Sequence, residues 1–220
     1  FVFVERRTAS PLVRIELLRE RGLASGLLSL GLVSTIMMAT LVVGPFYLSE
    51  VLGLGPVQTG LVMSTGPGVA ALVGFPAGRL VDAYGSARVM IVGLVGVSAG
   101  AALMMLLPVW FGTVGYVGSL VCITAGYALF QAANNTAVMA GAPQDRRGVT
   151  SALLGLARNL GLITGASAMG ALFALASNGV ELPGLIAGRE TGMVLTFAGA
   201  ALLAGLALTI TVRGLRLSAP

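Results

Sequence analysis

Six long apolar stretches, separated by short polar ones, dominate the pattern of residues along the chain. Each is long enough for an α-helix to cross a bilayer, which takes roughly 20 apolar residues. Because unpaired backbone groups are costly in lipid, stretches of this length are expected to be helical. The pattern therefore predicts an all-α integral membrane protein that is a bundle of six transmembrane helices. We expect these helices at residues 23–48, 57–77, 89–107, 113–140, 149–176 and 191–212.

The polar stretches at the two ends are expected to lie outside this bundle, which occupies residues 23–212. We interpret residues 1–22 as a cytoplasmic linker and residues 213–220 as a cytoplasmic tail. Within the linker, the pattern of residues 11–21 predicts an amphipathic helix at the membrane interface, and an ordinary solvated linker explains it equally well. The chain does not begin with Met, and residues 1–4 resemble the end of a preceding apolar helix, so we expect a longer parent protein.

Composition supports the membrane interpretation. Of the 220 residues, 56% are hydrophobic and 10% are charged, whereas soluble domains carry about 25% charged residues. All 13 basic residues are arginine, and the net charge is +5. Since these arginines mostly lie between the apolar stretches, membrane topology explains them better than binding to nucleic acid does, and we expect no nucleic-acid partner.

The chain offers little catalytic chemistry. It has no histidine, and its one cysteine, Cys122, lies inside an apolar stretch, so an internal disulfide and His-based catalysis or metal binding are excluded. A G-x-S-x-G pattern at residues 96–100 lies in the middle of a predicted span, without a histidine to act as base. We therefore predict that the protein is not an enzyme and needs no cofactor or metal.

The arginines also predict orientation. If residues 5–22 are cytoplasmic, every arginine except Arg189 falls on the cytoplasmic side, as the positive-inside rule requires. The opposite side then carries Arg189 with Glu50, Glu181 and Glu190. This arrangement predicts a multi-pass protein of the cell membrane in which both ends of the segment are cytoplasmic.

A stripe of polar side chains runs along the fourth predicted helix. Thr124, Tyr127, Gln131 and Asn134 recur at spacings of three and four and so share one face, with Asn135 beside them. Amide side chains in a membrane need partners or water, so the stripe should face the bundle interior or a cavity. It is a candidate substrate pathway, and hydrogen bonding between helices is an equally good explanation.

Other features inside or beside the helices are candidate packing or gating elements. Arg158 lies nine residues into the fifth helix, and we favour a structural role near an inner gate over direct contact with substrate. Pairs of glycines four residues apart predict close packing between helices. These pairs are Gly74 and Gly78, Gly96 and Gly100, and Gly161 and Gly165.

A short charged loop at residues 78–88 separates the second and third helices, and it contains Gly78, Asp82, Gly85 and Arg88. This spacing resembles the loop motif of the major facilitator superfamily. Residues 47–60 resemble the family's outer loop, and a later group resembles its late-helix pattern. That group comprises Asn134, Asn135, Pro143, Arg147, Gly148, Ser151, Arg158, Gly161 and Gly165. In order and spacing, these stretches are most similar to the fourteen-helix drug:proton antiporters.

The resemblance implies that the chain is the second half of a major facilitator, built from two inverted three-helix repeats. It further implies multidrug efflux by alternating access, with lipophilic or cationic compounds exported against proton influx. The implied partners are a small-molecule substrate, protons, the lipid bilayer and a missing N-terminal transmembrane half. The loop at residues 78–88 would be the conformational switch. No acid lies in the middle of a predicted span, so the coupling carboxylate is expected outside this segment. A metabolite or sugar facilitator and a non-transporting scaffold half remain alternatives.

Overall fold

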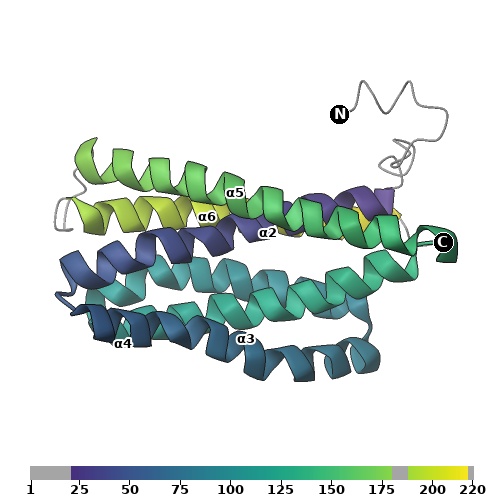
Figure 1. Cartoon of the computed structure of the whole chain (residues 1–220), viewed down its shortest axis with the longest axis horizontal. Helices are drawn as coiled ribbons and strands as arrows, with labels where there is room; N and C mark the ends of the chain where they lie inside the picture. Colours follow the sequence, from purple (N-terminus) through teal and green to yellow (C-terminus); the bar gives the residue numbers. More distant parts are fainter. Residues whose placement is uncertain (1–20, 180–187, 218–220) are drawn as a thin grey trace.

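The computed structural model describes residues 21–179 and 188–217, and in this part of the chain every regular element is helical. Figure 1 shows the long helices lying side by side along one axis. The prediction of an all-α protein is therefore confirmed, and five helices are long and apolar enough to cross a membrane. The elements are α2 (Arg21–Phe46), the π-helix η2 (Tyr47–Val51), α3 (Pro56–Tyr84), α4 (Ser86–Ala140), the 3₁₀-helix η3 (Gln144–Arg146), α5 (Arg147–Gly179) and α6 (Arg189–Leu217).

Helix α4 contains two of the six predicted spans. Its 55 residues would extend about 80 Å as a straight helix, whereas the hydrocarbon core is about 30 Å thick. The chain reverses at Gly112, where φ is 53° and ψ is −130°, a conformation that favours glycine. Glycines then let the two limbs pack closely, since a Cβ at Gly93 would stand 2.8 Å from the Cα of Phe130. A Cβ at Gly100 would stand 3.1 Å from the Cα of Ile123. The bundle therefore has six spans.

Close packing also explains one of the other glycine pairs. Gly161 and Gly165 on α5 lie against the backbone of α2 at Gly31 and Thr35, with no room for a Cβ. The Thr35 hydroxyl donates a hydrogen bond to the carbonyl oxygen of Gly161 at 3.0 Å. Small residues thus bring α2 and α5 together, as the spacing predicted.

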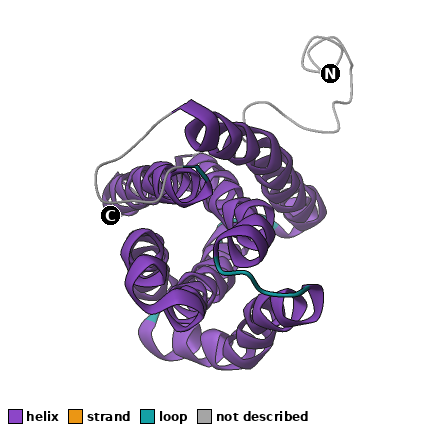
Figure 2. Cartoon of the chain, turned by 90° about the vertical axis from the view of Figure 1, so that its left-hand side faces the viewer, coloured by secondary structure: helices purple, strands orange, loops and turns teal. Residues whose placement is uncertain are grey.

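The pair Gly74 and Gly78 does not follow this rule in the described part of the chain. Both residues lie on the exposed side of α3, and no heavy atom lies within 4 Å of the position where a Cβ would stand. Helix α3 packs mainly against α4 and buries little of its surface, whereas α2 packs against α4, α5 and α6. The end-on view in Figure 2 shows the helices grouped as one bundle.

The turn between the second and third spans is shorter than the sequence predicted. Helix α3 continues to Tyr84 and α4 begins at Ser86, so only Gly85, with φ of 83°, interrupts the helices. Gly78 and Asp82 are therefore helical, and Arg88 lies in the first turn of α4. Helix α6 likewise continues past residue 212 to Leu217. The predicted amphipathic helix lies outside the described residues, apart from Arg21 at the start of α2.

Candidate functional site

The described turns and helix ends gather at two ends of the bundle. One end, at the right in Figure 1, holds the start of α2, the turn at Gly85, η3 and the end of α6. We call it the arginine-rich end, because it carries Arg79, Arg88, Arg146, Arg147 and Arg213. The opposite end holds η2, Gly112 and the start of α6. We call it the clamp end, for the contacts of Arg189 described below.

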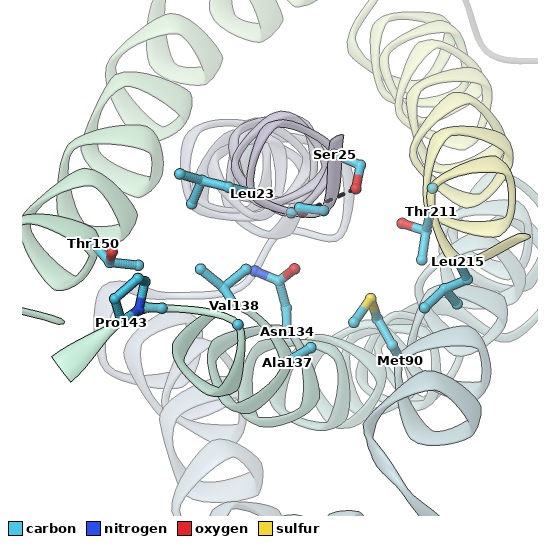
Figure 3. Close-up of a pocket in the computed structure, with 15 residues that line it drawn as sticks. Leu23, Ser25, Met90, Asn134, Ala137, Val138, Pro143, Thr150, Thr211 and Leu215 are labelled. Atoms are coloured by element: carbon cyan, nitrogen blue, oxygen red, sulfur yellow. Dashed lines mark hydrogen bonds between the residues drawn. The ribbon is translucent and has the colours of Figure 1, made fainter. Parts of the chain in front are cut away.

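A cavity of about 320 Å³ opens at the arginine-rich end. It lies inside the bundle, where α2, both limbs of α4, α5 and α6 converge (Figure 3). Its volume is at the lower end of the range for small-molecule sites and exceeds the space that one water needs. Most of the wall is apolar, and among the described residues that line it none carries a charge. The lining side chains include Leu23, Met90, Asn134, Val138, Thr150 and Thr211.

Asn134 is the most unusual residue in this wall. Its side chain is fully buried, and neither its amide nitrogen nor its oxygen has a hydrogen-bond partner among the described residues. The carboxamide points from α4 toward α2 (Figure 3), where a Cβ on Gly26 would lie 3.1 Å from its oxygen. A buried polar group without a partner costs about 1–3 kcal/mol. Because both polar atoms of the amide are covered by neighbouring atoms, Asn134 is packed against α2 at the edge of the cavity.

The other residues of the predicted stripe do not line this cavity. Thr124 is buried, and its hydroxyl, which has no hydrogen-bond partner in the described part of the chain, lies 3.8 Å from the position a Cβ on Gly66 of α3 would take. Tyr127, Gln131 and Asn135 are half-buried. The stripe thus runs along the second limb of α4, from residues near α3 to residues near α2. Only its last turn reaches the cavity.

Three hydroxyl-bearing residues of the cavity wall were missed by the sequence analysis. These are Ser25 on α2, Thr150 on α5 and Thr211 on α6. The Thr211 hydroxyl is 2.9 Å from that of Ser29 and is already paired. Each is a single small hydroxyl in an apolar stretch, a pattern that also occurs in ordinary helix packing. No signal in the sequence marks them as neighbours of Asn134.

The predicted switch residues and Arg158 lie on exposed surfaces. Asp82 and Arg88 flank the turn at Gly85, and α4 begins there without a side-chain cap. Arg158 is exposed on α5, and no ion pair is formed by it within the described ranges. Asp145 lies 3.7 Å from Arg146. Within the described residues, these side chains therefore make no contact that would support the roles predicted for them.

The clamp end is closed by a group of charged and aromatic side chains. Arg189, at the start of α6, forms an ion pair with Glu50 of η2. Its guanidinium also lies over two rings that stack on each other, 5.1 Å from the centroid of Phe46 and 5.8 Å from that of Phe173. These contacts tie α2, α5 and α6 together, and Glu190 beside them is buried. We call the group of Phe46, Glu50, Phe173 and Arg189 the clamp.

The π-helix η2 positions one side of the clamp. Pro45 has no N–H to donate and interrupts the regular hydrogen bonding of α2. The following turn widens, and the N–H of Leu52 donates to the carbonyl of Tyr47 at 3.1 Å, five residues earlier. Wide turns of this kind are frequent at functional sites. The Gly44-Pro45 sequence is thus followed directly by the widened turn that carries Glu50.

Comparison with known proteins identifies the family to which this bundle belongs. The model of the Major Facilitator Superfamily matches residues 4–166, which is most of the chain. A bundle of long apolar helices in the described part of the chain agrees with that match. The chain belongs to the Major Facilitator Superfamily of membrane transporters.

Several curated relatives are transporters. The uncharacterized transporter YebQ of Escherichia coli (strain K12) is 32% identical over the whole chain, which spans 46% of that protein. The multidrug efflux pump LfrA of Mycolicibacterium smegmatis is 26% identical over 91% of the chain and 40% of its own length. The riboflavin transporter RibZ of Clostridioides difficile is 27% identical over 59% of the chain and 28% of its own length. The chain thus spans less than half the length of these relatives.

Proposed function

We propose that the chain forms the second transmembrane half of a transporter that exports lipophilic small molecules by alternating access, driven by proton influx. The observation that carries the proposal is the unpaired, fully buried Asn134 beside a mostly apolar cavity within a bundle of the major facilitator family. A mostly apolar wall with few polar contacts suits recognition of varied lipophilic compounds. The name of the relative LfrA, a multidrug efflux pump, supports the same substrate class.

The exposed faces of the helices support a two-half arrangement. On α5, Arg158, Asn159, Thr164 and Ser167 are exposed. Arg158 and Asn159 are costly against lipid, so we propose that this part of α5 meets the other half of the protein or a water-filled path. Helix α3 exposes Gly74 and Gly78 beside the large side chains of Leu72 and Phe75, and we assign this exposed surface to the same side.

We propose a switch role for the turn between α3 and α4, and an inner-gate role for Arg158. Gly85 allows the sharp turn, while Asp82 and Arg88 beside it are exposed and available to a partner. A carboxylate at such a position binds well to the N-terminus of a helix in another part of the protein. Gly78, one turn earlier on the same exposed surface, leaves room for that approach.

We further propose that the arginine-rich end faces the cytoplasm and that the protein lies in the cell membrane. The rule that arginines favour the cytoplasmic side supports this orientation. Asp145 in η3 and the arginines around it would then contact the cytoplasm, while Glu50 and Arg189 would lie at the outer surface.

The test uses the full-length natural protein in inside-out vesicles that carry a pH gradient reported by a dye. Addition of lipophilic amines or neutral lipophilic compounds should collapse the gradient, and vesicles without the protein provide the control. If folded protein leaves the gradient intact across a broad panel of such compounds, the proposal of proton-coupled efflux is wrong.

A second candidate is a facilitator of narrow specificity for a metabolite, which the name of the relative RibZ, a riboflavin transporter, favours. The same vesicles distinguish the two. Uptake or release of one compound without movement of protons, and indifference to the rest of the panel, would support the facilitator.

A further inference from the structure

The reversal of α4 at Gly112 carries large apolar side chains in exposed positions. Trp110 is 80% exposed, Phe111 is 64% exposed and Val114 is 79% exposed. We call residues 109–114 the tip. Large apolar side chains gathered on one exposed turn mark a contact with a partner molecule or with a membrane.

The tip lies at the clamp end but has none of the charges found there. The π-helix η2 carries Glu50, and α6 begins with Arg189. Residues 89–144, which include the tip, contain no charged residue. A charged partner would therefore find no counter-charge on the tip, whereas an apolar environment would take its surface out of water at a gain in free energy.

The first limb of α4 has the length that brings the tip to a membrane boundary. Arg88 is exposed at the arginine-rich end, and the helix from Arg88 to Trp110 is about 33 Å long. The hydrocarbon core of a bilayer is about 30 Å thick. With Arg88 at one boundary, Trp110 therefore reaches the other. Tryptophan is enriched at that level because its ring is apolar and its N–H can bond to water or headgroups.

The exposed side of the first limb is apolar along its length, so the tip continues a surface that suits lipid. Its large exposed side chains include Val92, Val95, Leu103 and Leu106. We propose that the tip is a membrane anchor, which lies in the boundary between the hydrocarbon and headgroup layers at the clamp end. The rings of Trp110 and Phe111 are its main contacts with lipid.

The anchor bears on the clamp, because η2 packs against the same reversal. Leu52 directly follows η2, and its Cδ2 would lie 3.9 Å from a Cβ at Gly112. The rings of Tyr47 in η2 and Tyr116 in α4 stack with their centroids 6.3 Å apart. The depth of the tip in the membrane therefore also sets the depth of the turn that carries Glu50.

Spin labelling of the full-length protein in lipid nanodiscs measures this depth. Phe111→Cys and Val114→Cys, each in a background without other cysteines, would carry the nitroxide label. Oxygen concentrates in hydrocarbon, whereas a neutral nickel chelate stays in water, so the ratio of their collision rates with the label reports depth. At both positions, the oxygen-to-nickel ratio should exceed severalfold that of a label at Asn178, an exposed polar residue near the same end. It should approach the ratio at Val95, on the exposed side of the first limb.

Two results would overturn the proposal. A ratio as low as that at Asn178 would place the tip in water. Low collision rates with both reagents would show that protein covers the tip, either the other half of the transporter or a different molecule. Neither result depends on whether the protein transports lipophilic compounds or couples to protons.

Removing the two rings tests whether they hold the turn at this depth. In the double variant Trp110→Ser and Phe111→Ser, the oxygen-to-nickel ratio of a label at Val114 should fall severalfold. The double variant Val92→Ser and Val95→Ser removes two exposed apolar side chains from the same limb and should leave that ratio unchanged. An unchanged ratio in the tip variant would contradict an anchoring role for the rings.

A label at Ser49, which is exposed on η2, tests the link between the tip and the clamp. The tip variant should lower the oxygen-to-nickel ratio at Ser49 together with that at Val114. A ratio that falls at Val114 and stays constant at Ser49 would show that the depth of η2 is set by other contacts.

Discussion

The two ends of the bundle are built from different kinds of side chain. At the clamp end, Arg189 joins Glu50 and two aromatic rings, so charged and aromatic side chains from three helices close the bundle. At the arginine-rich end, small and aliphatic residues of the same helices surround a cavity, and a buried amide has no hydrogen-bond partner among the described residues.

This difference is compatible with the proposed role of the bundle as one half of a transporter. Large side chains that contact one another hold α2, α5 and α6 together at one end, while small residues leave space at the other. A carrier that exposes its site to one side at a time needs such an asymmetry, with one end closed while the other is accessible. If the clamp is the closed gate of one state, it must release when the opposite state forms. The following predictions test that requirement.

The largest effect is expected from locking the clamp. We would replace Glu50 and Arg189 by cysteine in a Cys122→Ser background and join the thiols with a short bifunctional thiosulfonate reagent. Because the side chains of the two native residues meet, the reagent should bridge them and abolish transport. Reduction should restore it. Each single-cysteine variant treated in the same way is the control, and transport that continues after complete cross-linking would show that this end need not open.

The clamp could not have been predicted from the sequence, although the fold could. Six apolar stretches predict six helices because lipid enforces helical backbone on any stretch of that length, and the reversal at Gly112 follows from the span limit. The pairing of Glu50 with Arg189 depends on which helices become neighbours after residues far apart in sequence come together. A loop carrying one acid and another carrying one arginine gives no sign of that contact.

The cavity was predictable in part. The polar stripe marked Asn134 as a residue that needs a partner or a cavity, and the structure places it at one. The same reasoning treated Tyr127 and Gln131 alike, yet they lie outside the cavity wall. Helical spacing predicts which residues share a face of a helix. It does not predict at which turn the packing against a neighbouring helix gives way to a cavity. That position depends on residues such as Gly26, which has no side chain and so leaves room for the Asn134 amide.

At the arginine-rich end, Asp82→Asn should slow transport severalfold without reducing the amount of protein in the membrane. The substitution removes the charge at the α3–α4 turn but keeps the size of the side chain, so folding of the exposed helix end should be unaffected. Initial transport rates at matched expression provide the measurement. Rates equal to those of the natural protein would remove this turn from the switching mechanism.

A smaller effect is expected when the cavity is narrowed. A Cβ at Gly26 would lie 3.1 Å from the Asn134 oxygen and only 2.5 Å from a methyl carbon of Val138. Gly26→Ala should therefore push both side chains and lower the free energy of unfolding by about 1–3 kcal/mol, as overpacking does. Gly118→Ala is the matched control, because no atom lies within 4 Å of its Cβ position on α4. Similar melting temperatures for the two variants would mean that α2 moves away at no cost.

The smallest effect should come from Arg189→Lys, which keeps the charge of the clamp but loses the planar guanidinium. An exposed ion pair contributes about 0–1 kcal/mol, and a cation–π contact contributes about 0.5–1 kcal/mol. Because lysine can still reach Glu50 but covers the rings of Phe46 and Phe173 less well, the free energy of unfolding should fall by less than about 1 kcal/mol. Arg189→Gln, which removes the charge as well, should lose more, and in that variant high salt should have little further effect. If Arg189→Lys and Arg189→Gln lower the free energy of unfolding by the same amount, the aromatic contacts rather than the ion pair hold this end closed.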